Sequence, residues 1–222
     1  MPTTTFPRVK RPGALAAAFL AALALAGCGL GSRPYPLVRT FALDPSVAQA
    51  PATGGVKSLK ASLIVTSAPP PGAYEGKKLV YMMAGRELVA DFYSELSAPP
   101  ARAVADGVAK RLELTEPAIL VVRTQGTQGP DWALEISLMD IYGDLSRPGA
   151  FTAELSATAT LTDLRRSSPK PAYARDFVMS EPVLQDPGES RAEALVRTYS
   201  ELVTRMVEEL RPEIRRIVVG RR

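Results

Sequence analysis

Residues 132–140 read Trp-Ala-Leu-Glu-Ile-Ser-Leu-Met-Asp, and residues 151–164 read Phe-Thr-Ala-Glu-Leu-Ser-Ala-Thr-Ala-Thr-Leu-Thr-Asp-Leu. These two stretches decide the fold, because apolar residues alternate along both and therefore share one face of an extended strand. The residues predicted to face the core are Trp132, Leu134, Ile136 and Leu138, followed by Leu155, Ala157, Ala159 and Leu161. Glu135 and Ser137 are predicted on the opposite, outward face.

A long helix is predicted near the end of the chain. Ser190 and Glu193 have the spacing of a capping box, in which each side chain bonds the backbone of the other residue. The apolar residues that follow at helical spacing are Leu195, Val196, Tyr199, Leu202, Val203, Met206, Val207 and Leu210. Arg211 and Pro212 are predicted to end this helix.

A second helix is predicted over residues 101–112. Its apolar stripe is Ala101, Val104, Ala105, Val108 and Leu112. Ser97 precedes it as a predicted capping residue, and Pro99 and Pro100 suit a first helical turn.

Further strands are predicted around these elements, over residues 58–66, 77–83, 118–123 and 173–179. Residues 87–96 fit a strand by alternation, and also a helix, because Leu88, Phe92 and Leu96 are four residues apart. Residues 84–86 are predicted as the turn before them. The sum is an α/β fold: a single domain over residues 56–215, with a mixed or mostly antiparallel sheet and two main helices in two or three layers.

The N-terminus has the layout of a secretory signal, with Arg8, Lys10 and Arg11 before an uncharged apolar run from Ala14. This run is too short to cross a bilayer as a helix. It closes on Leu25-Ala26-Gly27-Cys28, which resembles the bacterial lipobox. The resemblance implies that residues 1–27 are removed and that Cys28, the single cysteine, carries a diacylglycerol and an N-acyl chain. Residues 28–55 are then a tether, within which residues 35–43 fit an edge strand.

Removal of the signal corrects the charge of the chain. The full sequence has 27 basic and 23 acidic residues, and the signal contains three of the basic ones and no acidic one. The mature chain therefore has a net charge of only +1, which argues against nucleic acid as a partner. Gly29 follows the cysteine, and by resemblance to enterobacterial sorting this favours the outer membrane over the inner membrane.

Enzymatic chemistry finds little support in the sequence. It contains no histidine, which excludes Ser-His-Asp and Cys-His catalysis, and it contains no Gly-rich phosphate or dinucleotide loop. Carboxylate pairs of the glycosidase kind are the remaining alternative. The candidates are Glu135, Asp140, Asp144 and Asp163, each of which also has an ordinary structural explanation.

Aromatic residues are the better candidates for a functional surface, because tyrosine and tryptophan are enriched in interfaces. The aromatic candidates are Tyr74, Tyr81, Phe92, Tyr93, Trp132 and Tyr142. Core packing is the alternative for each of them and is favoured for Trp132 at the start of a strand. We predict partner contact through Tyr74, Tyr81 and Tyr93.

The order of motifs resembles the ABC-type transport auxiliary lipoprotein family, the PqiC-like subunits of MCE lipid transport systems. The motifs that carry the resemblance are Cys28, Tyr35-Pro36-Leu37, Tyr74, Leu79-Val80-Tyr81, Phe92-Tyr93 and Ser97-Ala98-Pro99-Pro100. The chain departs from the family pattern at Pro34, Met82 and Leu96, where tyrosine, arginine and tryptophan are usual. The resemblance spans residues 35–210.

This resemblance implies a non-enzymatic lipoprotein without a cofactor, facing the periplasm. Its expected partners are an MCE-domain protein with an ABC permease and ATPase, and it allows a homo-oligomer. Two other classes remain open: an assembly lipoprotein of a secretion or polysaccharide-export machine, and an envelope hydrolase. Co-purified partners distinguish the first of these, and the absence of histidine disfavours the second.

Overall fold

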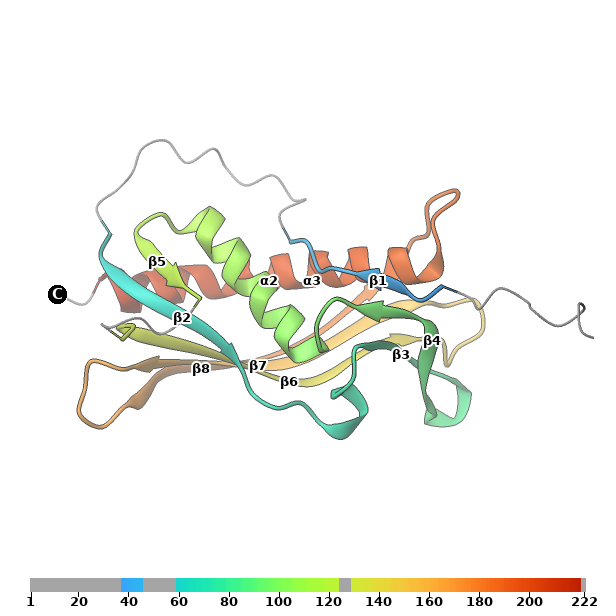
Figure 1. Ribbon diagram of the computed structural model, residues 1–222, viewed down its shortest axis with the longest axis horizontal. Coiled ribbons are helices and arrows are strands. Elements are labelled where there is room, and N and C mark those ends of the chain that lie inside the picture. The colour runs from blue at the N-terminus through green and yellow to red at the C-terminus, as the bar shows by residue number, and fades with distance from the viewer. Residues whose placement is uncertain (1–36, 46–58, 124–128, 221–222) are drawn as a thin grey trace, which may run out of the picture. The chain divides into compact units, whose positions relative to one another are not determined.

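The computed structural model describes residues 37–45, 59–123 and 129–220, and the predicted signal peptide and Cys28 lie outside these residues. Residues from Val38 onward form one compact unit. It contains one eight-stranded sheet and two main helices, which lie on the same face of the sheet (Figure 1). This confirms the predicted α/β class, and the pairing is mixed, with parallel and antiparallel ladders.

Three long strands pair antiparallel and form one side of the sheet, with the last of them at its edge. They are β6 (Trp132–Asp144), β7 (Thr152–Asp163) and β8 (Lys170–Pro182). The predicted alternation is confirmed: the expected core-facing residues of β6 and β7 are buried, while Glu135 is exposed. A bulge lies between Leu138 and Asp140, so that burial resumes at Ile141 instead of residue 140.

The other edge of β6 pairs with two separate groups of strands. At its start, β6 pairs in parallel with β2 (Ala61–Ser67), which in turn pairs with β5 (Ile119–Val122). At its end, Gly143 and Asp144 pair with β3 (Lys78–Met82), followed by β4 (Leu88–Leu96) and β1 (Arg39–Phe41). A short 3₁₀ turn, η2 (Gly72–Tyr74), lies in the connection between β2 and β3.

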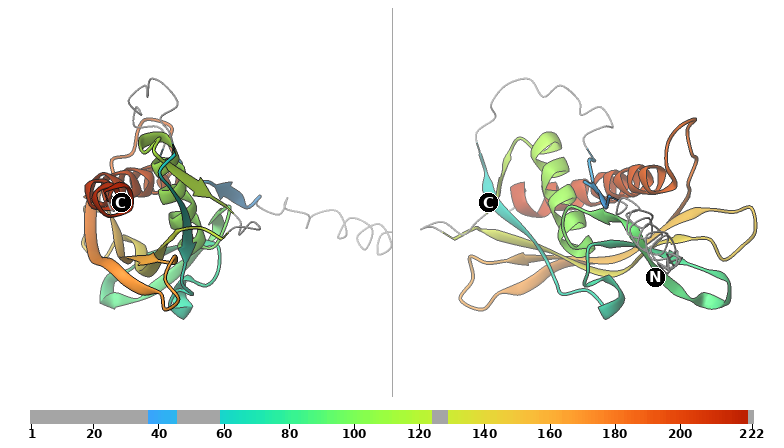
Figure 2. Two further views of the ribbon diagram at one scale, coloured as in Figure 1. Left: turned by 90° about the vertical axis from the view of Figure 1, so that its left-hand side faces the viewer. Right: turned by 45° about the vertical axis from the view of Figure 1, so that its right-hand side comes forward.

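Two helices cover the apolar face of the sheet. α2 (Pro100–Thr115) packs on β2, β5 and β6, and α3 (Arg191–Ile214) packs on β7 and β8. The helices approach closely at Gly107, where an added Cβ would lie 3.2 Å from the Cγ1 atom of Val203. The sheet curls so that β8 comes up beside α3 (Figure 2), and Arg205 of α3 bonds Glu181 of β8 at 2.6 Å.

The ends of the helices test the capping predictions. The capping box of Ser190 and Glu193 is confirmed, with the Ser190 amide donating to the Glu193 carboxylate at 2.8 Å. The predicted cap at Ser97 is wrong: Pro99 precedes α2 without a side-chain cap, and the Ser97 amide instead donates to Phe41 of β1 at 2.7 Å.

The predicted end of the last helix at Pro212 is also wrong. α3 continues to Ile214, and a π-helical turn, η4 (Arg215–Val219), follows it. The side chains of Ile214, Ile217 and Val218 are buried. Their burial offsets the hydrogen bond that a proline removes from a helix.

Residues 87–96 adopt the strand alternative, because β3 and β1 pair with the two edges of β4. The 3₁₀ turn η3 (Ala84–Arg86) forms the predicted turn before it, with Gly85 at a φ of 79°. β1 also confirms the edge strand predicted within residues 35–43. The division of the chain into signal, tether and domain otherwise stays a prediction.

Candidate functional site

A bulge in β4 presents two aromatic side chains to solvent. In the ladder with β3, Lys78 pairs with Glu95 but Val80 pairs with Ala90, so residues 91–94 of β4 lie opposite a single residue of β3. Phe92 and Tyr93 occupy this bulge, with 51% and 49% of their surfaces exposed. Their rings meet edge to face with centroids 5.1 Å apart. Bulges commonly re-aim side chains in this way beside functional sites.

Asp91 holds the bulge in shape. Its Oδ1 atom accepts hydrogen bonds from the backbone amides of Tyr93 and Ser94, at 2.8 and 3.1 Å. The Asp91 carboxylate also interacts with the Tyr81 hydroxyl. Burial, with the negative charge of Asp91, raises the pKa of Tyr81 to about 12. Tyr81 therefore stays a neutral donor, and its buried side chain contacts the Asp91 carboxylate that holds the bulge.

A groove of about 400 Å³ lies between this hairpin and the start of α3. Its lining includes Arg39, Tyr81, Met83, Val89, Tyr93 and Arg191. The Arg39 guanidinium bonds Glu193 at 2.6 Å and Ser190 at 3.1 Å, which ties β1 to the first turn of α3. Hydrogen bonds from Ser190 and Arg39 lower the pKa of Glu193 to about 2.

Tyr74, like Tyr81, lies in the interior, so that only Tyr93 of the three tyrosines predicted to contact a partner is exposed. It sits in the connection between β2 and β3, with only 2% of its surface exposed. Its hydroxyl donates to Asp140 of β6 at 3.2 Å, and burial, together with that carboxylate, raises its pKa. Tyr74 thus links the connection to β6 and has no exposed ring to offer a partner. Trp132 is fully buried, which confirms its predicted place in the core.

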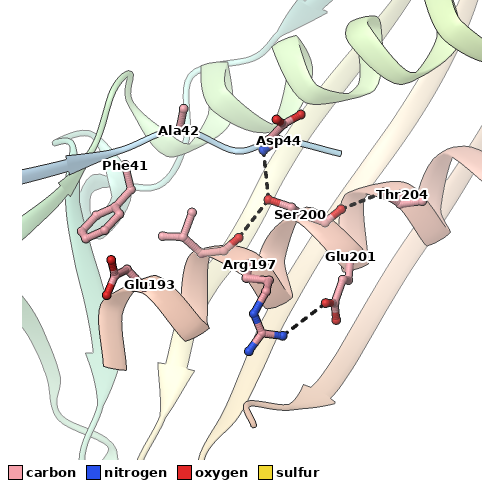
Figure 3. A pocket seen from close by; sticks show the side chains of 9 residues that line it. Phe41, Ala42, Asp44, Glu193, Arg197, Ser200, Glu201 and Thr204 are labelled. Atoms are coloured by element: carbon pink, nitrogen blue, oxygen red, sulfur yellow. Dashed lines mark hydrogen bonds and ion pairs between the residues drawn. The ribbon is translucent and has the colours of Figure 1, made fainter. Parts of the chain in front are cut away.

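A second groove, of about 530 Å³, runs along α3 beneath the segment that follows β1 (Figure 3). Its residues are Phe41, Ala42, Asp44, Glu193, Val196, Arg197, Ser200, Glu201 and Thr204, and we call it the α3 groove. The Ser200 hydroxyl accepts from the Asp44 amide at 3.0 Å and donates to the Val196 carbonyl at 2.9 Å. Arg197 reaches Glu201 at 3.4 Å. These polar groups bond one another, and the apolar surfaces of Phe41, Ala42 and Val196 are left to accept an apolar group.

The four candidate carboxylates do not form a pair. Glu135, Asp140 and Asp144 lie on β6, and neighbouring members of this set are four or five residues apart. Along a strand, this spacing separates their backbone positions by roughly 13–17 Å. Asp163 lies opposite Trp132 at the end of the ladder. Glycosidase pairs are separated by about 5–10 Å.

Each of these carboxylates also has a structural or solvated position. Glu135 is exposed, and Asp140 accepts the Tyr74 hydroxyl. Hydrogen bonding from the side chain and then from the amide of Ser146 lowers the pKa of Asp144, and the amide donates at 2.8 Å. Arg165 bonds Asp163 at 2.9 and 3.0 Å and lowers its pKa to about 2. Among the described residues, no three His, Cys, Asp or Glu side chains are grouped so as to hold a metal ion. Within the same part of the chain, no helix is long and apolar enough to span a membrane.

Sequence reasoning missed Asp91 and Arg39, which position the exposed aromatics and β1. An aspartate often accepts a hydrogen bond from the backbone amide two residues later, as Asp91 does from Tyr93. This local pattern is frequent and does not identify a bulge by itself. The available signal was that β4 has apolar residues on both of its alternating faces, whereas only one face can lie on the core.

Comparison with known proteins gives a family and a fold. A family model described as ABC-type transport auxiliary lipoprotein component matches residues 41–210. A solved protein from Xanthomonas campestris, of the family DUF330, is similar with a TM-score of 0.57 and 16% identity over 79% of this chain and 89% of that chain. A second solved structure, of an uncharacterized protein, has a TM-score of 0.55 and 12% identity over 78% of this chain and 99% of that chain. No curated protein sequence matches. At these identities the solved structures show the fold alone.

Proposed function

This chain belongs to the family of ABC-type transport auxiliary lipoprotein components, and from that premise we propose that it is a non-enzymatic subunit of an MCE phospholipid transport system that supports outer-membrane integrity. The observation that carries the proposal is the extent of the family match. Residues 41–210 run from the last residue of β1 into the last turn of α3, so that the match covers nearly all of the folded unit. The partners in this proposal are an MCE-domain protein and its ABC permease and ATPase.

The environments of the carboxylates support a non-enzymatic role. A catalytic acid needs its pKa raised toward the working pH. Asp144 and Asp163 instead have lowered pKa values, because each accepts hydrogen bonds that favour its charged form. Both therefore remain ionised at neutral pH, as structural acceptors.

We propose that Cys28 carries the lipid anchor and that the folded unit faces the periplasm from the outer membrane. The support is the sequence Leu25-Ala26-Gly27-Cys28 followed by Gly29. Two or more acyl chains hold a protein on a membrane stably, whereas one chain holds it only marginally. Labelled palmitate should enter the full chain in cells and should not enter the Cys28→Ala variant. Fractionation of the labelled cells then tests the membrane assignment.

We assign contact with the MCE-domain protein to the α3 groove. An apolar floor with a polar, hydrogen-bonded rim is the arrangement found in protein interfaces. The groove is also large enough to receive a partner side chain. Of the three tyrosines predicted to make this contact, Tyr74 and Tyr81 are given positioning roles because both are buried. Tyr93 belongs to a different, exposed surface.

Affinity purification of the tagged, acylated chain tests the proposal. We expect to recover the MCE-domain protein with the permease and the ATPase. The Phe41→Ala variant removes the ring that points toward α3 (Figure 3) and should lose most of this recovery, because the apolar wall of the α3 groove is then missing. Val178→Ala is the matched control, since Val178 is 87% exposed on β8. Recovery of only secretion or polysaccharide-export components, without an MCE protein, would overturn the proposal.

A further inference from the structure

We propose that the hairpin of β3 and β4 rests on a phospholipid bilayer surface, in the same leaflet that holds the acylated Cys28. The contact is made by Met83, Leu88, Val89, Phe92 and Tyr93, which we call the aromatic surface. All five side chains are exposed, although they are large and apolar. The inference rests on the proposed anchor and adds to it a direct contact between the folded unit and lipid.

The aromatic surface is built into the fold. The bulge at residues 91–94 projects Phe92 and Tyr93, and the two backbone hydrogen bonds that Asp91 accepts hold its shape. The Lys78 ammonium lies 4.7 Å from the centroid of the Phe92 ring. Met83, Val89 and Tyr93 line one groove together, and the Phe92 ring meets the Tyr93 ring edge to face. These exposed apolar side chains are therefore grouped, as at an interaction site, and are not scattered singly over the surface.

The path of the chain points to a bilayer as the occupant. In β1, Arg39 pairs with Ser94, the residue that follows Tyr93, so the chain enters the sheet beside the aromatic pair. Cys28 precedes Val38 by ten residues, which span at most about 35 Å when fully extended. An acyl anchor at Cys28 therefore keeps this end of the sheet close to the bilayer. At such a short tether length, even a weak contact is made at high effective concentration.

The side chains also suit the boundary between headgroups and acyl chains. Aromatic rings with a polar edge, such as that of Tyr93, favour this boundary. Lys77, Lys78 and Arg86 are exposed around the hairpin, and their long stems can lie along apolar surface while their charges reach phosphate groups. Glu87 and Glu95 balance much of this charge. Apolar insertion therefore drives the contact, and it does not require anionic lipid.

Quenching by lipid tests the contact directly. The acylated full chain with Phe92→Trp is reconstituted into phosphatidylcholine vesicles whose acyl chains carry bromine. We expect the added tryptophan to lose most of its emission, since bromine quenches at contact. In a matched chain, Val178→Trp should keep its emission. Trp132 is fully buried and supplies the same background to both chains.

If the brominated lipid quenches the same fraction of emission in both variants, the lipid contact is overturned. Loss of the MCE partner from Phe92→Ser and Tyr93→Ser variants, with no quenching in the Phe92→Trp chain, would assign the surface to protein and leave the proposed function intact. Failure of palmitate labelling at Cys28 would overturn the anchor, and with it this inference. Circular dichroism confirms that each exposed substitution has left the fold unchanged.

Discussion

The centre of the sheet and the hairpin of β3 and β4 bury their apolar residues to different degrees. Along β6 and β7, one face is buried beneath α2 and α3. The other face carries mostly threonine, serine and charged residues, together with Ala133, Met139 and Tyr142 of β6. Along β4, apolar residues lie on both faces, and most of them remain exposed. The comparison indicates that the centre of the sheet provides stability and that the hairpin offers a surface for contact.

The largest effect is expected from a truncation in the centre. Leu155→Ala removes a fully buried side chain of β7 and should lower the free energy of unfolding by about 2–5 kcal/mol. Val178→Ala, in the adjacent strand, should change it by less than about 0.5 kcal/mol because Val178 is exposed. Urea denaturation measures both. Equal destabilisation would contradict the division between a packed centre and its exposed face.

A smaller loss of stability is expected at Gly143, where β6 of the packed centre pairs with β3 of the hairpin. A Cβ atom at Gly143 would lie 2.8 Å from the Cε2 atom of Phe151 and 3.0 Å from the Cδ1 atom of Tyr81. Gly143→Ala should therefore cost about 1–3 kcal/mol through overpacking. The melting temperature of the variant measures this loss, and Gly129→Ala is the control, since a Cβ there meets nothing within 4 Å. An unchanged melting temperature would mean that the junction can relax.

Asp163 is expected to make a pH-dependent contribution. Its pKa falls from 3.8 to about 2 in the folded state, chiefly because Arg165 donates hydrogen bonds to it. The stability that it supplies is therefore present above pH 4 and is lost as the pH falls toward 2. Asp163→Asn should lower the free energy of unfolding by about 1 kcal/mol at pH 7. The difference in free energy of unfolding between this variant and the unsubstituted chain, measured by urea denaturation at several pH values, should disappear in acid. A difference that stays constant with pH would exclude the ionised Asp163 as its cause.

The smallest effect on stability is expected in the hairpin. Phe92→Ser removes a half-exposed ring, and the free energy of unfolding should change by less than about 0.5 kcal/mol. Guanidinium denaturation provides the measurement. A loss as large as that of Leu155→Ala would show that Phe92 is a core residue, and the distinction between the two regions would then fail.

Local patterns predicted the elements well, because their physical causes lie within each segment. The alternation in β6 and β7 identified the core face, and the capping box identified the start of α3. The local patterns gave a wrong prediction where a residue distant in sequence determined the structure. Ser97 pairs with Phe41 instead of capping α2, and α3 passes Pro212 because the core receives Ile214, Ile217 and Val218.

The candidate site was predictable only in part. Tyr93 was expected at the surface and lies there, whereas Tyr74 and Tyr81 are buried. A tyrosine ring can fill a core position when its hydroxyl finds a partner, and Asp140 and Asp91 supply those partners. The sequence contains all four residues but does not reveal which of them meet.

The sequence by itself determined the order of strands and helices, the buried face of the central strands and the family of the chain. Only the tertiary structure decided that one edge of β6 pairs with two separate groups of strands. It also decided that a bulge projects Phe92 and Tyr93 beside β1, where the chain enters the sheet. The reason is physical. Side-chain periodicity records which residues share a face, whereas strand edges are matched through backbone hydrogen bonds that every residue type can make.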